Sequence, residues 1–189
     1  EYIVITSVDR DDLPDGGADH FRKVTHAIKE LNPAVQIEVL TPDFIGKPDS
    51  LPLFNTMPLY VFSHNIETVP RLYPRIRPKS DYDHSLSVLK FMKENSSFRI
   101  KSGMMVGMGE TWDEVLTTIR DLKNNGCDVI TVGQYLRPSL KNFPVVDYIH
   151  PDRFKLLEIW GDENNVKVVA GPYVRSSYAG FFEKNGDHR

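Results

Sequence analysis

The chain has 189 residues, of which 40% are hydrophobic and 26% charged, and its formal net charge is −3. These values are ordinary for one globular domain with a sizeable core, and the slight acidity gives no overall basic field for nucleic acid. No apolar run approaches the roughly 20 residues that cross a bilayer, and the single cysteine excludes an internal disulfide. We therefore expect a single domain over residues 1–189, with neither nucleic acid nor a membrane as partner.

Six apolar runs follow one another along the chain. They are nearly continuous in their hydrophobicity, which is typical of parallel strands buried on both faces. Each run ends in a polar or glycine-containing segment. The predicted strands are Tyr2–Val8, Gln36–Leu40, Leu59–Phe62, Arg99–Val106, Asp128–Val132 and Val166–Ala170.

Stripes of apolar residues at helical spacing predict four helices between these strands. The helices are expected over 21–31, around 86–91 with a cap at Ser80 or Asp81, from the capping box of Thr111 and Glu114 to about 124, and from Pro151 to about 160. The segment Pro48–Pro58 contains three prolines and predicts a poor helix.

The alternation of strands and helices indicates an α/β fold with a parallel sheet. Six strand units do not close an eight-stranded barrel, so we expect a partial parallel (β/α) barrel or a barrel from which a unit is missing. The chain begins with Glu1 and enters a strand pattern at once. We expect it to start in mid-fold, the alternative being a processed or trimmed chain.

Polar side chains gather just after the predicted strands, where α/β folds place their binding sites. Parallel strands would bring these side chains to one rim and predict a pocket for a polar ligand, the alternative being that they are solvated loop residues. The residues are Ser7, Asp9, Arg10, Asp11, Asp43, His64, Asn65, Glu67, Lys101, Gln134, Arg137 and Arg175.

Other motifs are weaker. The glycines at 103, 107 and 109 fit neither phosphate-binding pattern and predict a strand that a ligand or a neighbouring backbone approaches closely. The histidines show no metal-ligand spacing, and only His64 follows a predicted strand. Cys127 precedes a strand and is expected to be a small buried residue.

Five longer motifs occur in one order: TSVDRDDLPDGG, HNIETVPRLYPRIRP, KSGMMVGMGET, GQYLRPS and GPYVRSSY. In these motifs the chain resembles lipoyl synthases of the radical SAM superfamily, from Tyr2 to about Tyr178. The resemblance implies a partial (β/α) barrel of the radical-SAM type that lacks its first unit, with residues 171–189 as a tail that caps a cluster. It also implies the insertion of two sulfur atoms, at C6 and C8 of a protein-bound octanoyl chain.

The resemblance also implies roles for particular residues. The side chains expected to line an S-adenosylmethionine pocket are Asp9, Asn65, Glu67, Arg77, Gln134 and Leu136. Ser177 is expected to bind one iron of an auxiliary cluster, with Ser176 as the alternative ligand. Arg175 is expected to orient the cluster or the substrate.

The complete enzyme is expected to use two 4Fe–4S clusters and S-adenosylmethionine. Each cluster needs three thiolates, which Cys127 alone cannot supply. We therefore expect this chain by itself to hold no cluster stably and to be inactive.

The implied partner is an octanoylated lipoyl domain or H-protein, and the oligomeric state stays open. The Leu72–Arg75 segment favours a bacterial, cytoplasmic protein, with the mitochondrial matrix or a plastid as alternatives. Two alternative functions remain open. One is a cluster-free module that binds a nucleotide-like ligand or a lipoyl-domain partner, and the other is a metal-independent enzyme with Asp9, His64 or Glu67 as acid or base.

Overall fold

The fold is built on one parallel sheet of six strands that pair in chain order, β1-β2-β3-β4-β5-β6. A computed structural model describes residues 1–177 of the chain. The strands are β1 (Tyr2–Thr6), β2 (Gln36–Leu40), β3 (Val61–Ser63), β4 (Arg99–Val106), β5 (Val129–Gln134) and β6 (Lys167–Gly171). All six predicted strands are thus confirmed, each within two residues at both ends.

Helices connect consecutive strands. They are α1 (Ala18–Leu31), α2 (Leu51–Phe54), the 3₁₀ turn η1 (Pro70–Leu72), α3 (Tyr73–Ile76), α4 (Tyr82–Asn95), α5 (Trp112–Asn124) and α6 (Pro151–Glu163). The four predicted helices are confirmed, and the proline-rich segment forms only the single turn of α2. Asp81 caps α4 by accepting a hydrogen bond from the His84 amide at 2.7 Å. Thr111 and Glu114 form the predicted capping box of α5.

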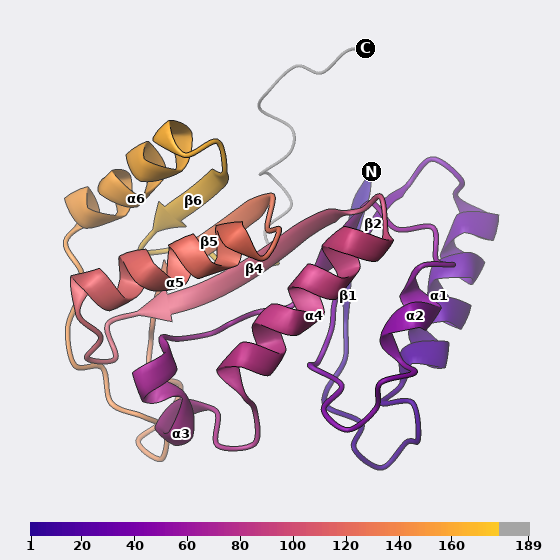
Figure 1. Ribbon diagram of the computed structural model, residues 1–189, viewed down its shortest axis with the longest axis horizontal. Helices are drawn as coiled ribbons and strands as arrows, with labels where there is room; N and C mark the ends of the chain where they lie inside the picture. The colour runs from indigo at the N-terminus through magenta and orange to yellow at the C-terminus, as the bar shows by residue number, and fades with distance from the viewer. Residues whose placement is uncertain (178–189) are drawn as a thin grey trace.

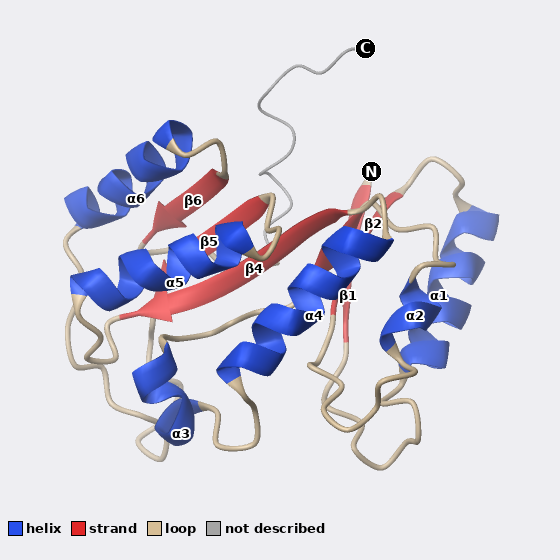
Figure 2. Ribbon diagram, viewed as in Figure 1, coloured by secondary structure: helices blue, strands red, loops and turns tan. Residues whose placement is uncertain are grey.

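The sheet curls, and the long helices cover its outer face (Figures 1 and 2). We call this the helix-covered face. Its strand side chains form the centre of the hydrophobic core and are all 0% exposed: Ile37, Val39, Phe62, Ile100, Ile130 and Val132. Burying each such side chain contributes roughly 1.5–3 kcal/mol. The architecture is the partial parallel barrel that the strand pattern predicts.

The opposite, inner face of the sheet is more polar. The strand register places Glu38, Lys101, Gly103, Thr131 and Gly133 on it. The Lys101 ammonium lies 2.8 and 2.9 Å from the two carboxylate oxygens of Glu38, with both residues almost fully buried. The expectation that Lys101 lies on the rim is therefore wrong, because it lies in the first half of β4, where its charge is matched inside the barrel.

Among the described residues, no helix combines the length and the apolarity that a bilayer crossing requires. The predicted tail over 171–189 extends past these residues, and positions 178–189 lie outside them.

Candidate ligand pocket at the carboxyl half of β4 and β5

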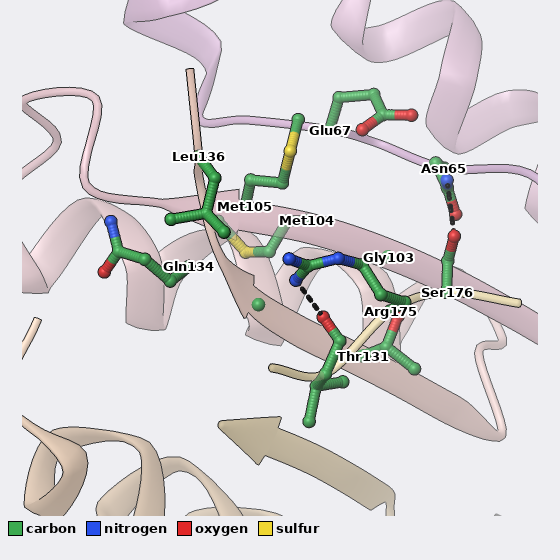
Figure 3. A pocket seen from close by; sticks show the side chains of 12 residues that line it. Asn65, Glu67, Gly103, Met104, Met105, Thr131, Gln134, Leu136, Arg175 and Ser176 are labelled. Carbon is green, nitrogen blue, oxygen red and sulfur yellow. Dashed lines mark hydrogen bonds between the residues drawn. The ribbon is translucent and has the colours of Figure 1, made fainter. Parts of the chain in front are cut away.

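A pocket of about 160 Å³ opens on the inner face, where β4 and β5 approach their carboxyl ends. Four stretches distant in sequence form its walls: the loop after β3, β4, the segment from β5 to Leu136, and residues 174–176 (Figure 3). The lining residues are Asn65, Glu67, Gly103, Met104, Met105, Thr131, Gly133, Gln134, Leu136, Val174, Arg175 and Ser176. Of the six side chains expected to bind a ligand, the structure brings four to this pocket: Asn65, Glu67, Gln134 and Leu136.

Two glycines make the pocket possible by leaving the inner face bare. A Cβ atom at Gly103 would lie 2.6 Å from the Thr131 hydroxyl and 2.9 Å from the Asn65 Oδ1. A Cβ atom at Gly133 would overlap the carbonyl oxygen of Val174. The close neighbours of Gly103 are thus side chains, and the predicted close approach of a backbone occurs at Gly107, where a Cβ atom would overlap the carbonyl oxygen of Asp147. We call Gly103 and Gly133 the glycine seat, because residues 174–176 rest against them.

Asn65 presents an unused acceptor to the pocket. Its Nδ2 donates to the Ser176 hydroxyl at 3.3 Å, as the dashed line in Figure 3 shows. Its Oδ1 is buried and has no hydrogen-bond partner among residues 1–177. Since an unsatisfied buried polar atom is costly, a donor on a bound ligand is the natural partner for this oxygen.

Glu67 is held in an unusual backbone conformation beside Asn65. Its φ of 66° is left-handed, which is rare for a residue with a side chain. Its amide donates to the Gly103 carbonyl at 3.0 Å, and its carbonyl accepts from Met105 at 2.8 Å. Burial raises the pKa of its carboxyl group, while Asn65 and Arg77 act in the opposite direction. Strained backbone of this kind is concentrated at functional sites.

Arg77 does not line the pocket but contacts the backbone of Asn65, which does. Its Nη1 donates to the Asn65 carbonyl at 3.0 Å, and its Nη2 lies 3.9 Å from Asp43. Asp9 lies elsewhere, in a second pocket of about 290 Å³ together with Asp43. Four of the predicted rim residues line the first pocket and four line the second, and Arg77 contacts residues of both. The other four line neither pocket: Ser7, His64, Lys101 and Arg137.

Gln134 and Leu136 reach the pocket differently. The Gln134 amide is fully engaged with the loop before α6, because its Nε2 donates to the Asp147 carbonyl at 3.0 Å and its Oε1 accepts from Ile149 at 2.9 Å. Gln134 therefore shapes the pocket wall without offering its amide to a ligand. The Leu136 side chain is 47% exposed and stands at the edge of the pocket.

The final described segment places its two serines differently. Ser176 lines the pocket, whereas Ser177 is exposed and does not. Arg175 lies across the pocket (Figure 3), and its Nη1 donates to the Val174 carbonyl at 2.8 Å. The pocket thus has a carboxylate, Glu67, and a guanidinium, Arg175, in its lining.

Two candidate groups from the sequence are not available to this pocket. His64 is buried, and its Nδ1 lies 3.0 Å from the Thr41 carbonyl. Desolvation lowers its pKa to about 4, so its imidazole is neutral at pH 7. Cys127 is buried as predicted, and burial raises the pKa of its thiol well above the ordinary value.

The described residues do not supply the three thiolates that an iron–sulfur cluster needs. Residues 1–177 contain no group of three or more His, Cys, Asp or Glu side chains placed to hold a metal ion. The residues do fit a polar organic ligand, because the free Asn65 oxygen and the glycine seat face one pocket.

Sequence reasoning missed part of this pocket. It did not single out Gly133, Thr131 or Met105 as site residues. The available signal was the glycine in the Val129–Gln134 strand, since a glycine inside a strand often marks close backbone approach.

Comparison with known proteins places this geometry in a family. The model of the radical SAM superfamily matches residues 1–133. The chain therefore belongs to the radical SAM superfamily, which confirms the superfamily inferred from the motifs.

Within that superfamily, two sequence relatives that match most of the chain are lipoyl synthases. The one from Caldicellulosiruptor saccharolyticus is 50% identical over 179 residues, covering 94% of this chain and 63% of the relative. The one from Chromobacterium violaceum is 50% identical over 181 residues, covering 94% of this chain and 58% of the relative. The chain thus spans about three fifths of the length of these two relatives.

Solved structures share the fold. Streptococcus suis SuiB superposes with a TM-score of 0.71 at 11% identity, over 89% of this chain and 39% of that one. Methylornithine synthase (PylB) superposes with a TM-score of 0.67 at 13% identity, over 100% of this chain and 63% of that one. At these identities the likeness shows the fold alone.

Proposed function

We propose that this chain is the larger part of the barrel of a lipoyl synthase, an enzyme that inserts two sulfur atoms at C6 and C8 of a protein-bound octanoyl chain. One observation carries the proposal: residues from HNIETVP, KSGMMVG and GPYVRSS, which are far apart in sequence, meet around one pocket. The similarity to lipoyl synthases over 94% of the chain supports it. The cytoplasm remains the proposed compartment.

S-adenosylmethionine is the proposed ligand of the pocket. In the complete enzyme, one electron from a reduced 4Fe–4S cluster would break its S–C bond and release methionine, giving the carbon radical that would remove hydrogen from the substrate. Its amino-acid part is zwitterionic, and the pocket offers Glu67 for an ammonium group and Arg175 for a carboxylate. The Asn65 Oδ1 is a free acceptor for a ligand N–H or O–H. At about 160 Å³ the pocket is smaller than the roughly 300 Å³ of typical ligand sites, so it would hold one portion of the ligand.

The clusters belong to the complete enzyme. Cys127 is the only thiol of this chain and is buried. We therefore propose that the chain alone stays colourless after anaerobic reconstitution with iron and sulfide. A stoichiometric brown species, measured by absorbance and iron analysis, would contradict this part of the proposal.

The complete protein tests the reaction itself. After anaerobic reconstitution it should form 5′-deoxyadenosine and convert an octanoylated lipoyl domain to the lipoyl form, measured by mass spectrometry under single-turnover conditions. Ligand binding without either product would favour the cluster-free binding module instead.

The two serines give a sharper test of the C-terminal motif. In the complete enzyme, Ser177→Ala should spare S-adenosylmethionine cleavage and abolish or strongly slow sulfur insertion, because Ser177 is the proposed oxygen ligand of the auxiliary cluster. Ser176→Ala is the matched control, since Ser176 is bonded to Asn65 inside the pocket. If Ser177→Ala gives normal product, and Ser176→Ala loses product but still cleaves S-adenosylmethionine, the ligand is Ser176 instead.

A further inference from the structure

Cations are segregated at the pocket's end of the barrel. Residues 68–80 and 135–146 contain no aspartate or glutamate, although the whole chain has a net charge of −3. These two segments carry six cationic side chains: Arg71, Arg75, Arg77, Lys79, Arg137 and Lys141. A local excess of one sign on an acidic protein raises the local potential and selects partners of the opposite sign.

The two segments lie side by side. The guanidinium carbon of Arg75, in α3, lies 4.9 Å from the centre of the Phe143 ring. The hydroxyl of Tyr135 donates to the Phe143 carbonyl at 2.8 Å, which ties the same loop to the end of β5. Figure 1 shows α3 next to the loop that joins β5 to α6.

Three of the cations stay without a carboxylate. Arg71 is paired with Glu114 at 2.7 Å, Arg77 is turned inward, and Lys79 borders the second pocket. Within residues 1–177, by contrast, Arg75, Arg137 and Lys141 form no ion pair. Arg75 and Lys141 are exposed, and Arg137 is fixed by donating to the carbonyls of Asn142 and Leu140.

Apolar side chains stand among these cations and reach the pocket. Leu140 is 87% exposed and Leu136 is 47% exposed. Leu136 also lines the ligand pocket, so the surface adjoins the pocket. We call Arg75, Arg137, Lys141, Leu136 and Leu140 the rim patch.

We propose that the rim patch docks the acidic face of a small protein domain, and that this docking delivers the domain's modified side chain to the pocket. The inference rests on the proposed function, because a protein-bound substrate must bring a protein surface against this rim. Three cations without carboxylate partners call for carboxylates on that surface, and the exposed leucines supply the apolar contact that separates a docking site from a merely solvated basic loop.

The test compares two substrates of the complete enzyme. One is an octanoylated lipoyl-accepting domain rich in Asp and Glu, and the other is a short uncharged peptide with an octanoyl-lysine. Arg75→Glu/Lys141→Glu should lower kcat/KM for the domain by about tenfold or more and leave the peptide unchanged. The parent should also lose activity on the domain as salt increases, and the variant should lose less.

The matched control is Lys90→Glu/Arg120→Glu, which makes the same charge change at exposed positions of the outer helices α4 and α5. Lys141→Glu alone guards against a displaced loop, because it leaves the Arg75–Phe143 contact in place. The unmodified domain is also titrated against each variant by calorimetry, which tests the patch without turnover.

The outcomes show whether the rim patch docks the domain. A selective loss on the domain, absent in the control, supports the rim patch. The proposal is overturned if the double variant changes activity on both substrates equally, or on neither. It is also overturned if the variant binds anionic vesicles or duplex DNA more weakly while its affinity for the domain is unchanged. If the parent modifies neither substrate, the proposed function fails, and the calorimetry still decides whether the patch binds the domain.

Discussion

The helix-covered face and the inner face of the sheet are made by the same six strands, yet they carry different residues. On the helix-covered face, Ile100 and Val132 are fully buried among helices. On the inner face, the neighbouring positions of the same strands are Lys101 and Gly133. One face therefore provides most of the hydrophobic stabilisation, and the other provides charge, hydrogen bonds and space. The difference teaches that stability and ligand binding can be altered separately in this fold.

The largest expected effect runs against the division between the two faces, because a residue of the inner face is expected to contribute strongly to stability. Lys101→Ala should lower the free energy of unfolding by about 3–5 kcal/mol, since the Glu38 carboxylate is left buried without its cation. Urea unfolding measures this loss. Lys101→Met/Glu38→Gln should recover most of it, because the introduced amide still offers the Tyr2 hydroxyl an acceptor in place of the carboxylate. Equal losses in the single and double variants would contradict the explanation.

A second effect concerns the loop after β3 and is tested by pH. His64 has a pKa of about 4 in the folded chain against an ordinary 6.5. Its contribution to stability is complete above pH 6.5 and is lost as the pH falls from 6.5 towards 4, because the unfolded chain takes up the proton first. The loss should reach about 3 kcal/mol at 1.36 kcal/mol per pKa unit.

Unfolding free energies at pH 7, 5.5 and 4.5 measure the His64 effect. In His64→Asn, which keeps a donor for the Thr41 carbonyl, the slope over this range should be smaller. An unchanged slope would show that other groups control the acid sensitivity.

The glycine seat allows stability and ligand binding to be measured for the same substitution on the inner face. Gly133→Ala should cost about 1–3 kcal/mol by overpacking, because the new methyl group meets the Val174 carbonyl oxygen. It should also weaken ligand binding, since residues 174–176 lose their seat. The matched control is Gly171→Ala, also without a positive φ, where the nearest atom is a flexible Val174 methyl at 3.3 Å. Calorimetric melting and equilibrium binding of S-adenosylmethionine report the two effects.

The smallest effect belongs to the helix-covered face alone. Thr111→Ala removes the cap of α5 and should cost about 1 kcal/mol. The affinity for S-adenosylmethionine should not change, because Thr111 is not part of the pocket lining. A thermal melt and the same binding assay check this, and reduced affinity would show that the two faces are coupled.

Much of the fold could be predicted because its signals are local. Continuous apolar runs mark the strands, and the capping box of Thr111 and Glu114 marks the start of α5. The turns at Pro70–Leu72 and Tyr73–Ile76 were not predicted, because one turn of helix is too short to show a periodic stripe.

The site could be predicted only in part, because it depends on which face each strand residue occupies. Asn65 and Glu67 follow a strand and were found. Lys101 was misplaced because its partner, Glu38, lies two strands away and no local pattern connects them. The role of Gly133 depends on a backbone segment about 40 residues later, so the strand pattern alone could not show it.

The strand order has a consequence for the making of the protein. Within residues 1–177, each strand pairs only with the strands that precede and follow it in sequence. A chain that leaves the ribosome at about 5–20 residues per second can therefore extend the sheet one unit at a time, without waiting for a distant partner. Residues 174–176, however, settle on β4 and β5, which are synthesised much earlier. The pocket is consequently among the last features to form, and a nascent chain that already has most of its core cannot yet hold a ligand there.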